Sequence, residues 1–175
     1  MQGEVRLQRA VHAAGEILRV DGEVIPVTAD NVHLAATYDN GESVVGEAAL
    51  DEPPPHLRAR RITTLTTTPR AVVTPAAAAA IRRADLVVLG PGDLYSSVLA
   101  NFVVEGVSDA LQCTAARVVY VCNLMERPGQ TCGMSAAAHV AEIERYTSRR
   151  VDAVLLNTAP LPPTLLTHYR DIDGT

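Results

Sequence analysis

A loop rich in glycine and hydroxyl groups is the first place in this sequence where chemistry is expected. The apolar run 86–89 is followed directly by Gly90-Pro91-Gly92-Asp93-Leu94-Tyr95-Ser96-Ser97. Glycine lets a backbone approach a ligand closely. Both serines fall in the first turn of the expected next helix, where free N–H groups and the helix dipole favour phosphate. The alternatives are a plain strand-to-helix turn for Gly-Pro-Gly, and for Asp93 either a helix cap or a contact to a ligand or Mg²⁺.

A second polar loop, 123–131, follows the apolar run 117–122. Asn123 stands at the strand end and Arg127 is a bidentate donor, a pair that suits a nucleobase edge, a ribose or sugar hydroxyls. The alternatives are a solvated charge for Arg127 and a core or wall position for Met125. No catalytic residue is predicted. The predicted ligand-binding residues of the two loops are Gly90, Pro91, Gly92, Asp93, Leu94, Tyr95, Ser96, Ser97, Asn123, Leu124, Met125, Arg127, Gln130 and Thr131.

The composition limits the chemistry that these loops perform. All 15 basic residues of the 175-residue chain are Arg. A Walker-type phosphate loop and Schiff-base chemistry need Lys, so both are excluded within this chain. Arg must make any cationic contact to phosphate, and its planar fork suits that role. The net charge of −5 and the lack of a large basic cluster argue against a nucleic-acid binder, and Arg58, Arg60 and Arg61 are interpreted as a solvated strand edge.

Neither metal-binding nor thiol motifs are present. The five His residues show no metal-ligand spacing, and His139 is interpreted as a core residue of a helix. The three Cys residues lack Cys-x-x-Cys spacing and are interpreted as reduced thiols. No apolar run approaches transmembrane length and the start lacks a signal-peptide pattern, so we expect a soluble, cytoplasmic protein without membrane insertion.

The first half of the chain predicts a small β-rich portion, 23–66, behind a helix. Apolar spacing indicates a helix over 5–19 and then a short strand over 23–27. Asn40-Gly41 is a strong hairpin signal between strands at 31–38 and 43–47. A Pro-rich loop at 51–55 leads to a Thr-rich strand at 60–66.

The second half, 70–170, predicts a βαβαβ unit. Thr74 suits the cap of a helix over 76–83. Buried strands are expected at 86–89, 117–122 and 151–156. They alternate with helices at 94–112, broken near Asn101 or Gly106, and at 135–149. Continuous Val/Leu runs between helices indicate a parallel sheet covered on both faces. We therefore expect one α/β domain, 1–175, with a Rossmann-like, three-layer parallel sheet and a small antiparallel piece. Ligands bind beyond the C-terminal strand ends, where the loops after all three strands converge.

Residues 84–99, Ala-Asp-Leu-Val-Val-Leu-Gly-Pro-Gly-Asp-Leu-Tyr-Ser-Ser-Val-Leu, resemble the signature of the YvcK family, also called the gluconeogenesis-factor family. That family is related to CofD, the 2-phospho-L-lactate transferase. Residues 118–131 resemble the family's Tyr-Val-Cys-Asn-Leu-Met-Thr-Gln-Pro-Gly-Glu-Thr stretch, and His139-Val140 resembles its Asp-His-Val. The likeness extends to about Tyr169, and the Leu94-Tyr95 pair favours YvcK over CofD.

The resemblance implies binding of a UDP-sugar such as UDP-N-acetylglucosamine, and a regulatory role in carbon metabolism, cell-wall synthesis and cell shape. It implies no established catalysis. One alternative is a CofD-like 2-phospho-L-lactate transferase that uses a guanine nucleotide and Mg²⁺ and acts on a deazaflavin. Another alternative is a non-binding remnant or an interaction domain.

The sequence departs from the family pattern in three places. The family's N-terminal Gly-Gly-Gly-Thr-Gly loop, which holds the nucleotide phosphates, has no counterpart here, and a C-terminal segment with a ligand-linked Arg lies beyond Thr175. Asp93 replaces a Ser, and residues 126–131 carry a different charge pattern from the family's loop. We therefore expect the central and later part of the family's chain, as a fragment, as a truncated reading frame, or as one lobe that needs a partner. Its uncovered sheet edge invites a homo-oligomer or the missing half.

Overall fold

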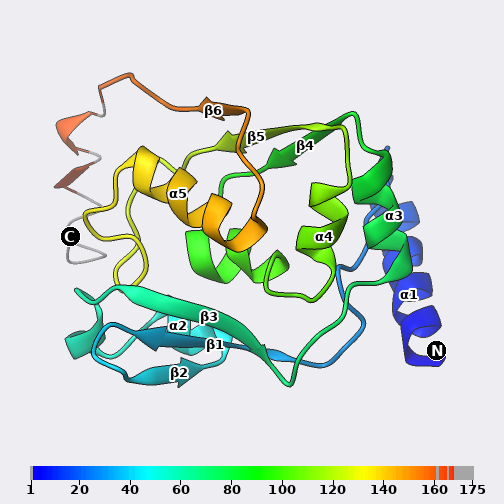
Figure 1. Cartoon of the computed structure of the whole chain (residues 1–175), viewed down its shortest axis with the longest axis horizontal. Coiled ribbons are helices and arrows are strands. Elements are labelled where there is room, and N and C mark those ends of the chain that lie inside the picture. The colour runs from blue at the N-terminus through cyan, green and yellow to red at the C-terminus, as the bar shows by residue number, and fades with distance from the viewer. Residues whose placement is uncertain (1, 161, 165, 168–175) are drawn as a thin grey trace.

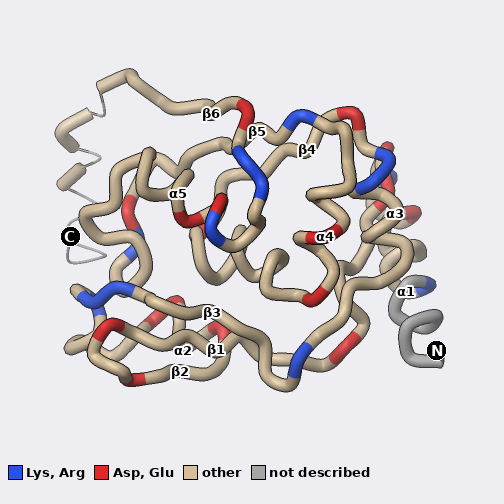
Figure 2. Tube along the Cα trace, in the orientation of Figure 1, with Lys and Arg blue, Asp and Glu red and all other residues tan. Residues whose placement is uncertain are grey.

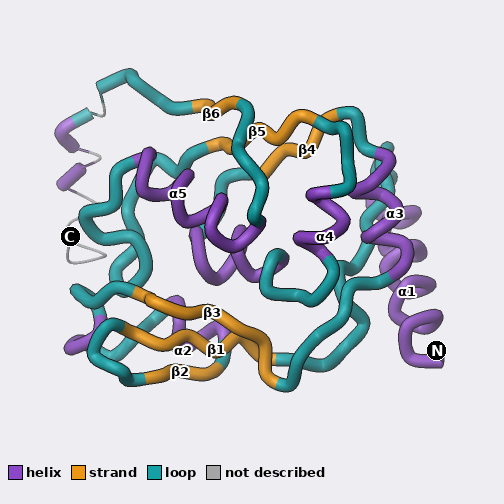
Figure 3. Tube along the Cα trace, in the orientation of Figure 1, coloured by secondary structure: helices purple, strands orange, loops and turns teal. Residues whose placement is uncertain are grey.

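Two three-stranded sheets lie on either side of a layer of helices in this computed structural model, which describes residues 2–160, 162–164 and 166–167 (Figure 1). The antiparallel sheet has the order β2-β1-β3 and consists of β1 (His33–Tyr38), β2 (Ser43–Val45) and β3 (Ile62–Thr68). The parallel sheet has the order β4-β5-β6 and consists of β4 (Leu86–Leu89), β5 (Arg117–Val121) and β6 (Ala153–Leu155). The layers are easiest to follow in Figure 3. The predicted α/β, Rossmann-like class and its antiparallel piece are confirmed.

The helices match most of the predicted ones. They are α1 (Gln2–Leu18), α2 (Glu47–Asp51), α3 (Pro75–Arg83), α4 (Val107–Gln112) and α5 (Ala136–Thr147), with shorter helical turns at Pro55–Leu57, Leu94–Val98 and Leu99–Asn101. Thr74 and Ser135 cap α3 and α5, because each side chain accepts a hydrogen bond from the backbone three residues on. None of the helices in the described ranges is long and apolar enough to cross a membrane.

The hairpin forms where the Asn-Gly pair predicts it. Gly41 has φ +84°, a left-handed conformation that glycine adopts without strain. The Tyr38 carbonyl accepts the Gly41 N–H at 2.9 Å, and the Tyr38 N–H donates to Glu42 O at 2.8 Å. Ala35 of β1 lies opposite Val45 of β2, so the turn fixes the register of the pair.

Two predicted elements are wrong in detail. Residues 23–27 form no strand; this segment is held by Thr74, whose N–H donates to Val27 O and whose hydroxyl donates to Pro26 O. The single helix expected over 94–112 is three pieces, a π-helical turn, a 3-10 turn and α4. The break falls at the predicted positions, since Gly106 takes φ +91° before α4.

The hydrophobic core runs through all three layers. Leu65 of β3, Tyr120 of β5 and Ile143 of α5 belong to one buried cluster. This core covers one face of the parallel sheet. On the other face Leu86 and Val88 are exposed, so the expected cover on both faces is present on one face only within the described residues. Acidic and basic residues are scattered over the described part of the trace in Figure 2.

Candidate functional site

A cavity of about 670 Å³ lies at the C-terminal ends of the three parallel strands. The loops after β4, β5 and β6 all contribute to it, as the parallel topology predicts. Its wall combines apolar side chains with a few polar ones, the usual make-up of a small-molecule site. The lining residues are Pro91, Asp93, Val121, Cys122, Asn123, Leu124, Met125, Glu126, Arg127, Leu155, Leu156 and Asn157.

Asn123 joins the first two loops at the floor of this cavity. Its side-chain oxygen Oδ1 accepts the Gly92 N–H at 2.7 Å. A Cβ on Gly92 would lie 3.1 Å from the Ser97 Cβ, so any side chain at this position would press against Ser97. Asn123, which follows β5, therefore holds the Gly90–Asp93 turn through its hydrogen bond to the Gly92 N–H.

Gln130 holds the glycine-rich loop from behind. It is 3% exposed, and its Oε1 accepts the Tyr95 N–H at 3.2 Å and the Ser96 N–H at 3.3 Å. Its Nε2 donates to the Ser96 hydroxyl at 3.2 Å and to Asp51 Oδ1 at 3.3 Å. The expectation that these first-turn amides are free for phosphate does not match the structure, because the amide oxygen of Gln130 occupies them.

Several predicted site residues thus face the interior and support the cavity wall. Leu94, Tyr95, Ser96 and Thr131 are buried together with Gln130. The Thr131 hydroxyl accepts the Arg127 N–H at 2.8 Å and so fixes the base of the second loop. Of the fourteen predicted residues, the structure places six on the cavity wall: Pro91, Asp93, Asn123, Leu124, Met125 and Arg127.

Arg127 and Asp93 form the charged part of the wall. Arg127 Nε lies 3.7 Å from Asp93 Oδ2, and its Nη2 donates to Asp51 O at 3.0 Å. Each of the paired side chains is about one-third exposed. Asp93 does not cap the following turn through its side chain, whereas its carbonyl accepts the N–H groups of Ser97 and Val98. The pair leaves one guanidinium on the cavity wall with most of its charge balanced by a neighbouring carboxylate.

A preformed Mg²⁺ site is not supported by this wall. Of its two carboxylates, Asp93 pairs with Arg127, and Glu126 Oε2 accepts the Gly133 N–H at 3.0 Å. The described residues include no group of three or more His, Cys, Asp or Glu side chains placed to hold a metal ion. Hard divalent cations need several oxygen ligands, so the residues present do not fit one.

A partly buried chain of polar groups connects the glycine-rich loop to α5 and, through the Tyr95 hydroxyl and Ile62 O at 3.3 Å, to β3. The Tyr95 hydroxyl donates to Glu142 Oε1 at 2.8 Å, and Arg145 Nη2 donates to the same oxygen at 2.6 Å. Burial and the hydrogen bond to Glu142 raise the pKa of Tyr95 far above its ordinary value. Burial acts to raise the pKa of Glu142 as well, but the hydrogen bonds from Arg145 and Tyr95 outweigh it, so that pKa lies below its ordinary value.

His139 is a core residue, as the sequence predicts. It is buried on α5, and its Nδ1 lies 2.9 Å from the Tyr120 hydroxyl. Burial lowers the pKa of His139, against the opposing effect of the nearby Glu126. The ring is therefore neutral at pH 7. It packs in the interior and does not line the cavity.

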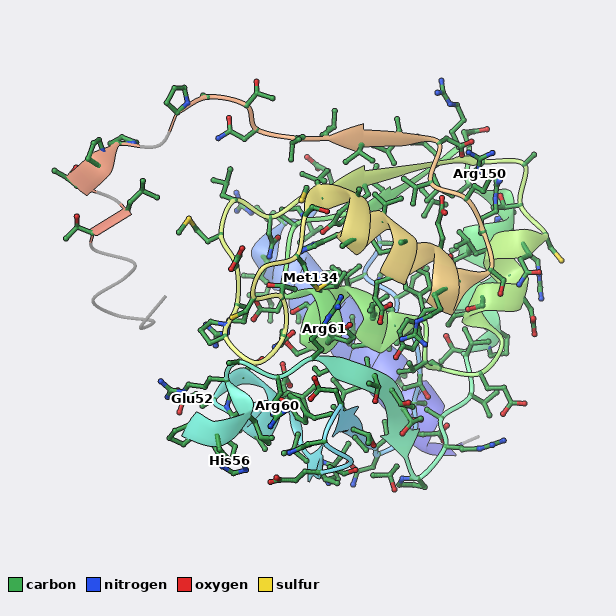
Figure 4. The ribbon with its side chains drawn as sticks, turned by 60° about the vertical axis from the view of Figure 1, so that its left-hand side comes forward. Glu52, His56, Arg60, Arg61, Met134 and Arg150 are labelled. Atoms are coloured by element: carbon green, nitrogen blue, oxygen red, sulfur yellow. The ribbon has the colours of Figure 1, made fainter. Side chains whose placement is uncertain are left out.

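The exposed charges near β3 lie elsewhere. Figure 4 shows Glu52, His56 and Arg60 at one end of the antiparallel sheet. His56 Nε2 is 2.9 Å from Glu42 Oε2, and Arg60 Nη1 is 3.7 Å from Asp39 Oδ1. The Arg60–Asp39 ion pair and the His56–Glu42 hydrogen bond are both solvent-exposed and of small energetic value, consistent with the predicted solvated edge.

The sequence analysis did not predict two residues that support the loops, Asp51 and Glu142, or the part of the cavity wall that follows β6. Asp51 and Glu142 make long-range contacts that no local pattern encodes. Leu155 and Leu156 were expected to be strand, yet they border the cavity. Their position at the C-terminal end of an apolar run was the available signal.

Comparison with known proteins identifies relatives over almost the whole chain. The family model described as 2-phospho-L-lactate transferase CofD matches residues 1–174. A protein of Thermotoga maritima described as "Putative gluconeogenesis factor" is 36% identical over 167 residues, which is 95% of this chain and 52% of the relative. One of Nostoc sp. with the same description is 35% identical over 170 residues, 96% of this chain and 36% of the relative.

A crystal structure shows the same fold. A UPF0052-family protein from Bacillus halodurans aligns with a TM-score of 0.85 at 31% sequence identity, covering 94% of this chain and 52% of that chain. This chain therefore spans between about one-third and one-half of the length of these relatives.

Proposed function

This chain belongs to the CofD family, and we propose that its cavity at the C-terminal ends of β4, β5 and β6 binds a nucleotide sugar of the UDP-N-acetylglucosamine type. The observation that carries the proposal is the cavity itself, about 670 Å³ and built by three strand-end loops. A volume of that order suits a ligand of intermediate size. Regulation of carbon metabolism, cell-wall synthesis and cell shape is the biological role that the gluconeogenesis-factor resemblance supports, in the cytoplasm.

The chemistry of the wall supports a ligand with both polar and apolar parts. Asn123 and Asn157 offer amide groups that pair with a base edge or with hydroxyls. Arg127 supplies the cation. Its planar guanidinium suits the oxygens of a diphosphate, which would compete with the Asp93 carboxylate for this contact. Leu124 and Met125 provide an apolar surface for a ring. The backbone amides at Tyr95 and Ser96 do not contribute, since Gln130 holds them.

Isothermal titration with UDP-N-acetylglucosamine, without and with Mg²⁺, tests the proposal. Leu124 is 61% exposed and lines the cavity, so Leu124→Glu adds a negative charge there without disturbing the core. Repulsion of the diphosphate is expected to weaken binding by about tenfold or more, roughly 1.4 kcal/mol. Val45→Glu is the matched control, because Val45 is 56% exposed on β2, outside the cavity wall.

The result separates three cases. Binding that Leu124→Glu weakens and Val45→Glu leaves unchanged supports the proposal. Equal affinity in both variants places the ligand elsewhere and contradicts it. The absence of heat at millimolar ligand, with the thermal melting point unmoved, also contradicts it for this chain.

The alternative function is a CofD-like transferase, favoured by the description of the matching family model. It predicts preference for a guanine nucleotide and turnover of a phospholactyl nucleotide that depends on Mg²⁺. Titration with GDP in place of the UDP-sugar, under the same conditions, distinguishes the two ligands. Preference for GDP would favour the transferase.

A further inference from the structure

The cavity at the strand ends carries more negative than positive charge. Among the described residues that line it, Asp93 and Glu126 are acidic and Arg127 alone is basic. Asp51 adds a third carboxylate behind the wall, where its Oδ1 accepts the Ser96 hydroxyl at 2.7 Å. That donor is neutral and cancels none of the Asp51 charge. An anion that binds at Arg127 therefore comes close to three carboxylates.

Arg127 is held in place by groups other than the Asp93 side chain. Its backbone N–H donates to the Thr131 hydroxyl at 2.8 Å, and its Nη2 donates to Asp51 O at 3.0 Å. A guanidinium has five N–H donors, and the bond to Asp51 O uses one of them, so donors remain for a ligand oxygen. Because neither of these bonds involves Asp93, a change of the Asp93 side chain should leave the cation on the cavity wall.

Asp93 gives its backbone to the turn and its charge to the cavity. Its carbonyl accepts the N–H groups of Ser97 and Val98 at 2.9 and 3.1 Å, whereas its side chain does not cap the turn. Its Oδ2 lies 3.7 Å from Arg127 Nε, which is an ion-pair distance and too long for a hydrogen bond. Both side chains are about one-third exposed, so the carboxylate acts on any ligand that reaches the guanidinium.

The short distance between Asp93 and Arg127 makes the charge of the ligand important. An oxygen that contacts the guanidinium would lie within about 7 Å of the Asp93 carboxylate. At such a range in a partly exposed site, each unit of negative charge on the ligand weakens binding by about tenfold. A sugar-capped diphosphate carries about two negative charges. The free nucleoside diphosphate carries about three above pH 7, because its terminal phosphate loses a second proton near pH 6.

We propose that Asp93 is a specificity-determining residue, which makes the cavity select a diphosphate with an esterified terminal phosphate over the free nucleoside diphosphate. Because it concerns the ligand of the same cavity, this selection rests on the proposed function. A wall with Arg127 and without Asp93 would favour the more highly charged ligand. Glu126 acts in the same direction as Asp93, but its Oε2 accepts the Gly133 N–H, whereas Asp93 is the carboxylate paired with the cation.

Calorimetric titration of UDP and UDP-N-acetylglucosamine into the unchanged chain and into Asp93→Asn tests the selection. Asn keeps the size of the side chain and removes its charge. We expect Asp93→Asn to bind both ligands more tightly and UDP to gain more, so that the preference for the nucleotide sugar falls by about three- to tenfold near pH 7.5 and low ionic strength. The change should shrink at about 1 M salt, where the Debye length is about 3 Å.

Asp39→Asn is the matched control. Asp39 Oδ1 also lies 3.7 Å from an arginine nitrogen, Arg60 Nη1, and this pair is outside the cavity wall, at one end of the antiparallel sheet (Figure 4). The substitution removes the same charge from the protein and should leave the preference unchanged. An unchanged preference in Asp93→Asn, or an equal change in both variants, overturns the proposal.

Inorganic pyrophosphate separates the charge selection from the proposed function, because it has the charge of a diphosphate without a base or a sugar. Its binding is followed by the NMR signals of the Arg127 guanidinium, and it should be about tenfold tighter in Asp93→Asn than in the unchanged chain or in Asp39→Asn. If this difference appears and the nucleotide sugar binds none of the three proteins, the proposed function is refuted and the role of Asp93 stands. If the nucleotide sugar binds and pyrophosphate affinity is the same in all three, the role of Asp93 is refuted. Arg127 signals that pyrophosphate moves in none of the three proteins also overturn the proposal.

Discussion

Gln130 illustrates how one buried side chain organises a cavity wall that it does not itself line. Its amide oxygen accepts hydrogen bonds from two backbone N–H groups of the glycine-rich loop, and its amide nitrogen donates to Ser96 and Asp51. A buried amide with every group paired specifies one arrangement of its surroundings, because any other leaves a desolvated donor or acceptor. The loop after β4 and the loop after β5 are consequently one unit.

Removing this amide should destabilise the protein. Gln130→Ala leaves the Tyr95 and Ser96 N–H groups buried without an acceptor, so the free energy of unfolding should fall by about 2 kcal/mol or more. Urea denaturation measures the change. Gln112→Ala is the control, since Gln112 is exposed at the end of α4 and makes a single long contact of 3.5 Å to Thr147 O. Equal losses in the two variants would contradict the role given to Gln130.

His139 should make the stability depend on pH in a defined window. Burial lowers its pKa in the folded state, so the unfolded chain binds the proton more readily. The stabilisation is complete above the ordinary His pKa of about 6.5 and is lost as the pH falls from there toward the lowered folded value. Unfolding free energies between pH 7.5 and 5 test this. His139→Gln should flatten the dependence in that window, whereas His33→Gln, at an exposed position of β1, should retain it.

At the scale of elements, Gly106 decides where α4 begins. It takes φ +91°, and a Cβ there would lie 2.7 Å from Val73 Cγ1. Gly106→Ala should therefore lower the unfolding free energy by about 1–3 kcal/mol, through backbone strain and the steric contact together. Gly22→Ala, with no atom within 4 Å of the added Cβ and no positive φ, should be close to neutral in the same thermal or urea measurement. An unchanged unfolding free energy in Gly106→Ala would contradict this, because it would mean that the backbone before α4 and Val73 move to accommodate the methyl group.

Elements with a strong local signal were predictable, and those decided by distant contacts were not. The run 86–89 matches β4 at both ends, and Asn40-Gly41 identifies the hairpin. The segment 23–27 has the apolar residues of a strand, yet Thr74, far along the chain, holds its carbonyls. The same limit applies to the site. Parallel topology predicts that the three loops converge, but only the fold brings Gln130 to Ser96 and Asp51 to Arg127.

At the scale of the whole molecule, two three-stranded sheets differ in what they present to their surroundings. The helical layer and the core lie between them. The antiparallel sheet turns the hydroxyls of Thr37, Ser43 and Thr64 outward, as expected of a sheet with one wet face. The parallel sheet turns Leu86 and Val88 outward, beside the exposed Arg117. The difference follows from winding, because connections that all pass on one side cover only that side.

Leu86 and Val88 on this outward side therefore contribute little to the stability of the described fold, and a double substitution should show it. Thr retains β propensity, so Leu86→Thr with Val88→Thr should change the urea midpoint only slightly while it lowers the binding of an apolar dye and raises the temperature at which aggregation begins. Val118→Thr, on the buried face of neighbouring β5, is the control and should cost about 1–3 kcal/mol, because its hydroxyl is buried among apolar side chains. A loss of similar size in the double variant would mean that Leu86 and Val88 are packed within this chain in solution.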